Sequence, residues 1–469
     1  MSEKNEPIFE NEEFLILLQK YEKMRSSEHS TFFDVEEFEQ IIDYYLDEFL
    51  YDQAAEAARL GSVQHPASVE IKYKVVHVYL EQGMGKQALE MLEYIPTWEH
   101  SNSEFYYLKG TAQCLSGKIH DAERSFDKGL SISTEDNFEA LLNIAIAFEN
   151  ARQYRHAIKY LEMAHEISPE YLSVIYDLGY FNERIDKYKK SVEYYQEYLD
   201  QDPFSENVWY NLGVAYFQLE LPYKALEAYE YSLALNPDYA SAYFNKANTY
   251  SGLGLYEKAI ETISEFLEIE PDNEHALIFL GDTYEQTNQY SKALTIYKKV
   301  IELDNTDSEG WFGAGMVHYQ LNNYDEATIY LLKALEFDNQ NTDYWINLGY
   351  VYEESDRKEE AVKCFRQVVK IDKTDHEGWL LLSGVLLNLD ALDDALIVLR
   401  LAITEFPENE MLAIKMAECQ YKLDNFRPGL KFLAQALAVD ADLLPDFLEK
   451  MGKKVLDKPT LDLIRKYKV

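Results

Sequence analysis

The side chains that bind metals or transfer protons are present in this chain, but their spacing predicts no site. The ten histidines are scattered, and no two of them stand four positions apart, as a metal site on one helix face would require. Cys114, Cys364 and Cys419 lie far apart and suggest neither a disulfide framework nor a metal knuckle. Among 84 acidic residues, a pair of carboxylates indicates nothing about acid–base catalysis. We therefore predict no catalytic residue, no metal site and no cofactor.

A partial phosphate-loop motif is also better explained by structure. The run from Gly83 to Lys86 reads Gly-Met-Gly-Lys, but it lacks the full spacing and the Ser or Thr that follows the lysine in a phosphate-binding loop. His77 and His275 are expected on an inner face of the fold, each without a second histidine. We expect them to be polar surface residues and not ligands or general bases.

The dominant feature of the chain is a repeat of 34 residues. An anchor residue, small in ten of twelve copies, returns at this interval, with a single step of 35 after Gly110. The anchors are Ile42, Val76, Gly110, Ala145, Gly179, Gly213, Ala247, Gly281, Gly315, Gly349, Ser383 and Ala417. Twelve positions after each anchor stands a second small residue, from Ala54 in the first copy to Gly429 in the last. Two helices can approach closely only where both side chains are small, so the pattern predicts a helix hairpin in every repeat.

Turn and breaker residues occupy the places that hairpins require. The turn between the two helices carries residues that tolerate a left-handed backbone, and prolines follow the second helix in six repeats. The turn residues are Gly83, Gly117, Asp186, Gly254, Asn288, Asn322, Asp356, Asp390 and Asp424, and the prolines are Pro66, Pro169, Pro203, Pro237, Pro271 and Pro407.

These features resemble the tetratricopeptide repeat family. The sixth repeat carries the family pattern in full: Trp209, Leu212, Gly213 and Tyr216 on the first helix, then Ala225, Tyr229, Ser232 and Pro237. The resemblance covers residues 35–443 and implies an all-α fold, a right-handed α-solenoid superhelix of about twelve repeats. Ile42 and Val76 depart from the small anchor, which leads us to expect slightly different packing in the first two hairpins.

In this family the first helix of each repeat lines the concave face, and the resemblance implies the same here. Three positions before the anchor, a first row runs from Tyr73 to Ile414 and contains no Lys or Arg, so the carboxylate clamp of chaperone-docking relatives is missing. One position after the anchor, a second row runs from His77 to Glu418. Acidic residues interrupt the groove at Glu149, Glu183, Glu285, Glu353 and Glu354, and an asparagine slot is filled by Asn143, Asn211, Asn245 and Asn347, with Asp177 in the same position. Amide side chains in such a row can hold extended peptide backbone.

Our leading interpretation is a non-enzymatic scaffold that binds an extended or helical segment of a protein partner. The groove would be centred on the fifth to seventh repeats. Its candidate binding residues are Tyr176, Asp177, Tyr180, Tyr210, Asn211, Phe217, Phe244, Asn245, Asn248, Phe312 and Met316. The alternative is a chaperone-like holder of basic clients. An enzyme that uses the acidic groove is disfavoured, because no catalytic motif and no room for a catalytic domain are present.

The charge of the chain indicates the kind of partner. Its net charge of −40 repels nucleic acid phosphates and favours a protein or peptide rich in Lys and Arg, although much of this charge is expected to serve solubility alone. Ribosomal or nascent protein segments and the cytoplasmic loops of membrane machinery have this chemistry. We therefore expect no direct nucleic acid partner and leave open a peripheral association with a membrane or a ribosomal complex.

The segments outside the repeats are short. Residues 1–34 hold an amphipathic stretch around Phe14 and Tyr21, and residues 444–469 hold seven basic against four acidic residues. We expect both to cap the terminal repeats, with docking to an acidic groove or to anionic lipid as the alternative for the basic tail. No signal peptide and no apolar run long enough to span a membrane are found, which predicts a cytoplasmic location.

Overall fold

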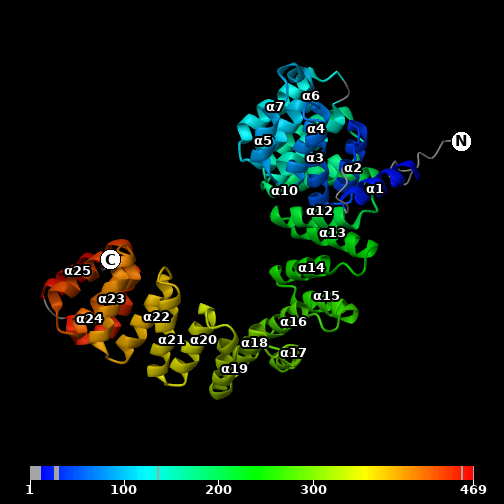
Figure 1. The fold of residues 1–469 in the computed structure, drawn as a ribbon. Coiled ribbons are helices and arrows are strands. Elements are labelled where there is room, and N and C mark those ends of the chain that lie inside the picture. The colour runs from blue at the N-terminus through cyan, green and yellow to red at the C-terminus, as the bar shows by residue number, and fades with distance from the viewer. Residues whose placement is uncertain (1–11, 26–30, 135–136, 456–457, 468–469) are drawn as a thin grey trace. The chain divides into compact units, whose positions relative to one another are not determined.

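The computed structural model describes residues 12–25, 31–134, 137–455 and 458–467, and these residues form helices and turns without a strand. The chain divides into two units, Met1–Ala242 and Tyr243–Val469, and the division falls in the first turn of α14 (Ala240–Gly252). Successive helices pair into hairpins along the chain (Figure 1). The expectation of an all-α solenoid of helix–turn–helix repeats is confirmed.

In the first unit, a leading helix α1 (Glu12–Arg25) precedes six hairpins. The first helices of the hairpins are α2 (Val35–Asp47), α4 (Val69–Glu81), α6 (Ser103–Leu115), α8 (Phe138–Asn150), α10 (Leu172–Arg184) and α12 (Glu206–Gln218). Their partners are α3 (Tyr51–Gln64), α5 (Gly85–Leu92), α7 (Ile119–Ile132), α9 (Tyr154–Ile167), α11 (Tyr188–Gln201) and α13 (Pro222–Leu235).

In the second unit, six further hairpins are followed by two short helices. Beginning with α14, the first helices are α16 (Glu274–Gln286), α18 (Ser308–Gln320), α20 (Thr342–Glu354), α22 (His376–Asn388) and α24 (Glu410–Lys422). The second helices are α15 (Tyr256–Ile269), α17 (Tyr290–Leu303), α19 (Tyr324–Phe337), α21 (Lys358–Ile371), α23 (Leu392–Glu405) and α25 (Phe426–Val439). The terminal helices are α26 (Leu444–Met451) and α27 (Lys458–Tyr467).

Most hairpins show a size match between their two helices. A Cβ atom added to Gly213 would lie 2.5 Å from the ring of Tyr229, which is buried on the second helix 16 positions later. Gly110, Gly179, Gly281 and Gly349 each face an aromatic ring at the same spacing in the same way. Where the anchor is Ala145, Ala247, Ser383 or Ala417, the residue 16 positions later is Leu or Ile. A larger side chain on one helix thus requires a smaller one on the other.

The same rule explains one of the two large anchors, Ile42, whereas the other, Val76, has the buried Leu92 16 positions later and does not follow it. Ile42 is completely buried, and the residue 16 positions later is Ala58, which belongs to the same buried cluster. The hairpin therefore keeps its close packing with the sizes exchanged between the two helices.

Turn residues behave as the sequence predicts. All nine of the Gly, Asp and Asn residues expected in a left-handed conformation have a positive φ, from 53° at Asp390 to 72° at Gly83 and Gly117. The equivalent turn positions Phe49, Arg152 and Glu220 also have a positive φ, which residue type alone does not predict.

Indole groups fix the start of the later repeats. The Nε1 atom of Trp209 donates to the carbonyl of Pro203 at 2.9 Å. Trp311, Trp345 and Trp379 each make the equivalent bond, at 3.0 Å, to the carbonyl six residues earlier. These bonds tie each first helix to the preceding turn even where no proline ends the previous helix.

The second repeat departs from the expected pattern. Helix α5 has only eight residues, whereas the other second helices have 14, and the chain then forms a 3₁₀ helix, η2 (Thr97–Ser101), after Pro96. Proline cannot donate the backbone hydrogen bond that would continue the helix, which accounts for the early end.

Both terminal segments pack on their neighbouring repeats. Phe14, Leu17 and Tyr21 of α1 lie in one buried cluster with Phe38 and Ile41 of α2. At the other end, Leu444, Phe447 and Met451 of α26 and Ile464 of α27 join the cluster of the last hairpin. Residues 1–11, 26–30, 456–457 and 468–469, and the side chains of Lys453 and Lys454, lie outside the described part, and with them part of the N-terminal segment and part of the basic tail.

Candidate functional site

In the first unit, α10 and α12 bring two of the predicted residues together. These neighbouring first helices contact each other, and the Nδ2 atom of Asn211 donates to the Oη atom of Tyr176 at 3.2 Å. Both side chains are half-buried, so part of each remains available to a ligand. The amide of Asn211 keeps its carbonyl oxygen and a second N–H for other bonds.

The guanidinium of Arg184 lies over the ring of Tyr180, one of the predicted aromatic binding residues. The ring of Tyr180 stacks on that of Tyr176, with centroids 6.3 Å apart and planes 6° apart. The guanidinium of Arg184, one helical turn further along α10, lies 4.8 Å from the centre of the Tyr180 ring, and its Nη2 atom donates to Oη at 2.5 Å. The sequence analysis missed Arg184, although its spacing of four from Tyr180 is the signal that would have found it.

Two carboxylates on this face have no neutralising partner. Loss of hydration raises the pKa of Asp177 to about 6, and repulsion from Glu149 on α8 acts in the same direction. Within the described residues, no side-chain hydrogen bond or ion pair involves either carboxylate. A bound cation would therefore stabilise the ionised form of Asp177.

Tyr210 and Phe217 also lie on α12. The Tyr210 ring is 5.0 Å from that of Tyr239, whose hydroxyl donates to Asn207 Oδ1 at 3.0 Å. Phe217 is 39% exposed. The structure thus adds Tyr239, in the turn before α14, to the predicted set.

The predicted residues of the second unit do not form one cluster. Phe244 packs against Phe266 of its own hairpin, with ring centroids 5.5 Å apart, whereas Phe312 on α18 stacks on Tyr344 of α20 at 4.6 Å. Met316 packs against the same buried cluster as Phe312. Asn245 is half-buried and Asn248 is exposed on α14.

Acidic residues of the second unit group around a buried tyrosine. Tyr297 of α17 donates its hydroxyl to Asp282 Oδ1 of α16 at 2.6 Å. Loss of hydration, reinforced by repulsion from Asp282, raises the pKa of Glu285 to about 7.

Loss of hydration is likewise the main cause that raises the pKa of Glu353 on α20, and the adjacent Glu354 adds to it.

The asparagine row is partly engaged within the fold. Asn347 donates to the backbone carbonyl of Asp343 on its own helix at 2.8 Å, and Asn211 donates to Tyr176. Asn143 is exposed. Each amide keeps some bonding capacity, so the ladder hypothesis stays a prediction.

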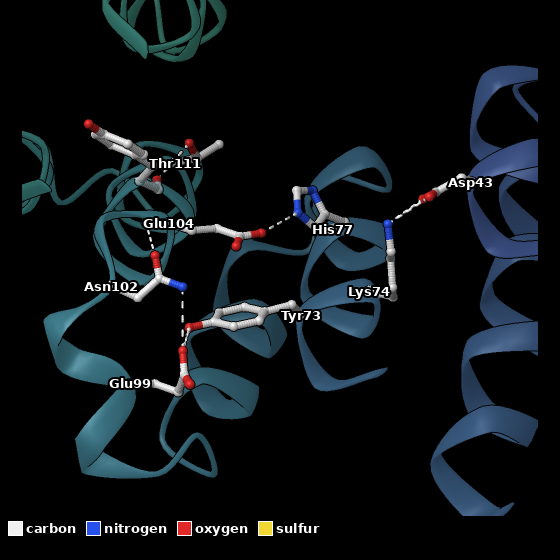
Figure 2. Close-up of polar contacts among 9 residues, drawn as sticks. Asp43, Tyr73, Lys74, His77, Glu99, Asn102, Glu104 and Thr111 are labelled. Atoms are coloured by element: carbon white, nitrogen blue, oxygen red, sulfur yellow. Dashed lines mark hydrogen bonds and ion pairs between the residues drawn. The ribbon is translucent and has the colours of Figure 1, made fainter. Parts of the chain in front are cut away.

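Polar side chains connect the first three repeats along the same side of the first helices (Figure 2). The Nζ atom of Lys74 lies 2.7 Å from both carboxylate oxygens of Asp43, and His77 Nε2 lies 3.7 Å from Glu104 Oε1. The hydroxyl of Tyr73 donates to Glu99 of η2 at 3.2 Å. His77 has a carboxylate neighbour, Glu104, that the sequence analysis missed.

The described residues contain no group of three or more His, Cys, Asp or Glu side chains able to hold a metal ion. All three cysteines are buried, and burial raises the pKa of the Cys114 and Cys364 thiols to about 12. None of the described helices combines the length and apolar character needed to cross a bilayer.

Comparison with known families agrees with the repeat architecture. Tetratricopeptide repeat models match residues 206–239, 228–261 and 342–375, and a model of anaphase-promoting complex (cyclosome) subunit 3 matches residues 252–334. The paired helices define an α-solenoid repeat protein. The chain is a tetratricopeptide repeat protein, a class that generally serves as a non-catalytic scaffold for protein interactions.

Several solved structures resemble parts of the chain. MamA is 25% identical over 34% of this chain and 95% of its own, with a TM-score of 0.33. A tetratricopeptide repeat protein from Parabacteroides merdae is 18% identical over 53% of this chain and 99% of its own, with a TM-score of 0.42. YrrB, described as a tetratricopeptide repeat protein with an unusual peptide-binding site, is 22% identical over 40% of this chain and 96% of its own, with a TM-score of 0.32. No curated protein matches the chain in sequence.

Proposed function

We propose that the chain is a scaffold whose inner faces bind Lys- or Arg-rich segments of protein partners. The observation that carries the proposal is the neighbourhood of Asp177, where two carboxylates without a cation lie on the same face as half-buried tyrosine rings. A basic side chain placed there would gain both charge neutralisation and contact with an aromatic face.

Each kind of residue has a distinct part in this binding. The Tyr176 ring provides apolar and cation–π contact, the Tyr180 ring does so where a partner cation displaces Arg184 from it, and the free bonding capacity of Asn211 holds peptide backbone. The Glu285 and Asp282 cluster offers the second unit an acidic face of its own, so each unit is proposed to bind separately. Binding needs no cofactor, and we propose a cytoplasmic location.

The proposal is tested with an extended peptide of about ten residues that alternates Lys or Arg with aliphatic residues. The double variant Asp177→Asn/Tyr180→Ala is expected to weaken binding by roughly tenfold or more, since a charged contact and an aromatic contact are each about 1 kcal/mol. Tyr223→Ala, which removes a 71% exposed ring at the start of α13, is the control and should bind like the wild type.

Equal binding by the double variant and the wild type, with unchanged circular dichroism, would place the binding site elsewhere. For the second unit, Glu285→Gln combined with Phe312→Ala serves the same purpose. The chaperone-like alternative makes a different prediction: the chain would suppress the aggregation of many unrelated basic proteins at equimolar concentration, and the same double variant would reduce that suppression.

A further inference from the structure

The last repeat has a lysine in the slot that other repeats fill with asparagine. Lys415 on α24 stands two positions before the anchor Ala417, as Asn211 stands before Gly213. Its ammonium makes no hydrogen bond and no ion pair with any residue that the structure describes. In a chain with 84 acidic and 44 basic residues, a half-buried lysine without a partner is unexpected.

The second repeat shows how a lysine in this slot is neutralised. Lys74 on α4 stands two positions before its anchor Val76, and Asp43 on the preceding first helix, α2, stands one position after the anchor Ile42. The Nζ atom of Lys74 lies 2.7 Å from each carboxylate oxygen of Asp43 (Figure 2). A lysine in this slot therefore points at the second-row residue of the previous repeat.

For Lys415 the equivalent residue is Gly384 on α22. A Cβ atom added to Gly384 would lie 3.1 Å from Lys415 Nζ and 3.8 Å from its Cε atom, so the lysine points to the place where a side chain of residue 384 would begin. Gly384 is the one glycine in the second row, and α22 contacts α24. The carboxylate that neutralises Lys74 thus has no counterpart here.

A cavity takes the place of the missing side chain. Its volume is about 290 Å³, and its lining includes three ammonium groups and one carboxylate: Lys415, Lys422, Lys450 and Glu418. Two nearby carboxylates are already engaged, because Lys450 of α26 donates to Glu418 at 3.3 Å and Lys422 donates to Asp390 at 2.7 Å. Glu353 of α20 is close enough to attract the Lys415 charge, but no hydrogen bond or ion pair joins the two described side chains. Burial is the main cause that lowers the pKa of Lys415; repulsion from Lys450 acts in the same direction, and attraction by Glu418 and Glu353 acts against it.

We propose that the cavity between α22, α24 and α26 binds a carboxylate of a partner peptide, which takes the place that Asp43 fills beside Lys74. This site is different from the carboxylate clamp excluded above, because its lysine lies in the asparagine slot and a helix outside the repeats supplies Lys450. It is also separate from the basic-segment sites, and its ligand has the opposite charge. Failure of one proposal therefore leaves the other standing.

The first test supplies the carboxylate from the chain itself. Gly384→Asp should place a carboxylate beside Lys415, whereas Gly384→Asn has nearly the same size and helix propensity without the charge. We expect the Asp variant to unfold at a higher urea concentration than the Asn variant, and we expect Lys415→Met to abolish that difference. Equal midpoints for the Asp and Asn variants would overturn the proposal.

The second test uses small probes on the full-length protein. Acetyl-Asp-Ala-Ala-amide carries a side-chain carboxylate, Ala-Ala-Ala acetylated at its N-terminus carries a terminal one, and acetyl-Ala-Ala-Ala-amide carries none. Shifts of the Lys415 ¹³Cε signal should occur with one or both carboxylate probes and not with the neutral one, and the active probe identifies the source. The apparent affinity should fall roughly tenfold or more in Gly384→Asp, because loss of a charge-assisted contact is of that order.

Lys74→Met is the matched control, since it removes a lysine from the same slot of a repeat that has its own aspartate. It should leave the response of the Lys415 signal unchanged. If the carboxylate probes and the neutral probe give the same response, or if Gly384→Asp binds like the wild type, the cavity is not a carboxylate site.

Discussion

The size match between paired helices makes a quantitative prediction for Gly213→Ala. The new Cβ atom would lie 2.5 Å from Tyr229 Cε1 and 2.6 Å from Cδ1, whereas ordinary carbon contacts begin near 3.4 Å. The Tyr229 ring is buried, so it must move by about 1 Å within a packed core, which costs roughly 1–3 kcal/mol. Alanine regains about 1 kcal/mol of helix propensity. We therefore expect a net loss of up to about 2 kcal/mol.

The double variant Gly213→Ala/Tyr229→Leu separates this clash from other effects. It recreates the Ala and Leu combination that the chain has at Ala145 and Leu161. The free-energy change of the double variant should be smaller than the sum of the two single changes by about 1 kcal/mol or more, as expected for residues in contact. The assay is hydrogen exchange of the α12 and α13 amides in the full chain, because repeat proteins can open locally.

Gly315→Ala provides the control within the same chain. Its Cβ atom would meet the aliphatic side chain of Leu331 at 3.0 Å, a contact that a flexible side chain can relieve by a small movement. We expect it to be close to neutral. A Gly213→Ala variant more stable than the wild type, or strict additivity in the double variant, would refute the size-match argument.

Further predictions concern charge and backbone strain. Because the Glu285 carboxyl has a pKa of about 7 in the folded chain and about 4.3 when unfolded, the folded state binds more protons between these values and loses stability as pH rises through them. Glu285→Gln should therefore raise the free energy of unfolding at pH 8 by about 1 kcal/mol, after allowance for solvent screening, and change it little at pH 4. Urea unfolding at both pH values measures the difference, and midpoints that shift equally at pH 4 and pH 8 would contradict the prediction. Arg184→Ala uncovers the Tyr180 ring and should strengthen binding of the basic peptide by roughly three- to tenfold. Lys224→Ala removes the same charge from the buried Tyr216 ring and should not strengthen binding. If isothermal titration gives the same gain for both variants, net charge alone explains the effect. Arg152→Gly relieves a positive φ, so it should stabilise the fold by about 1 kcal/mol and raise the thermal midpoint. Asp186→Gly should raise the midpoint less, because aspartate tolerates a left-handed backbone better than arginine. A larger rise for Asp186→Gly would contradict the strain argument.

Much of the fold is predictable because each repeat packs two helices in the same way, with similar residue types at equivalent positions. The 34-residue period locates the hairpins, and residue type predicts the left-handed turns at positions such as Asp186 and Gly254. Residue type does not predict the positive φ at Phe49, because helix geometry on both sides imposes it there. The short helix α5 and the 3₁₀ helix after it follow from Pro96, a local departure that a search for the period passes over.

The sequence predicts which residues lie at the candidate site better than it predicts which of them contact each other. The row positions put Tyr176, Asp177 and Asn211 on neighbouring first helices, and the structure brings Tyr176 and Asn211 into contact. The cation–π contact of Arg184 depends on the rotamer of a long side chain, which repeat spacing does not determine. The cavity beside Lys415 exists because Gly384 has no side chain. A search of the sequence for charged, nucleophilic or metal-binding residues passes over a glycine and so does not find this cavity.

The central claim is that the acidic inner faces bind basic protein segments. The most direct measurement is the affinity of the alternating Lys or Arg peptide for the wild type and for Asp177→Asn/Tyr180→Ala, each at about 50 mM and about 300 mM salt. If the inner faces bind basic segments, the wild type should bind the peptide saturably, the double substitution should weaken binding, and salt should reduce binding without abolishing it. Peptide binding that disappears completely at the higher salt and is the same for both proteins would contradict it, because charge alone would then explain the association.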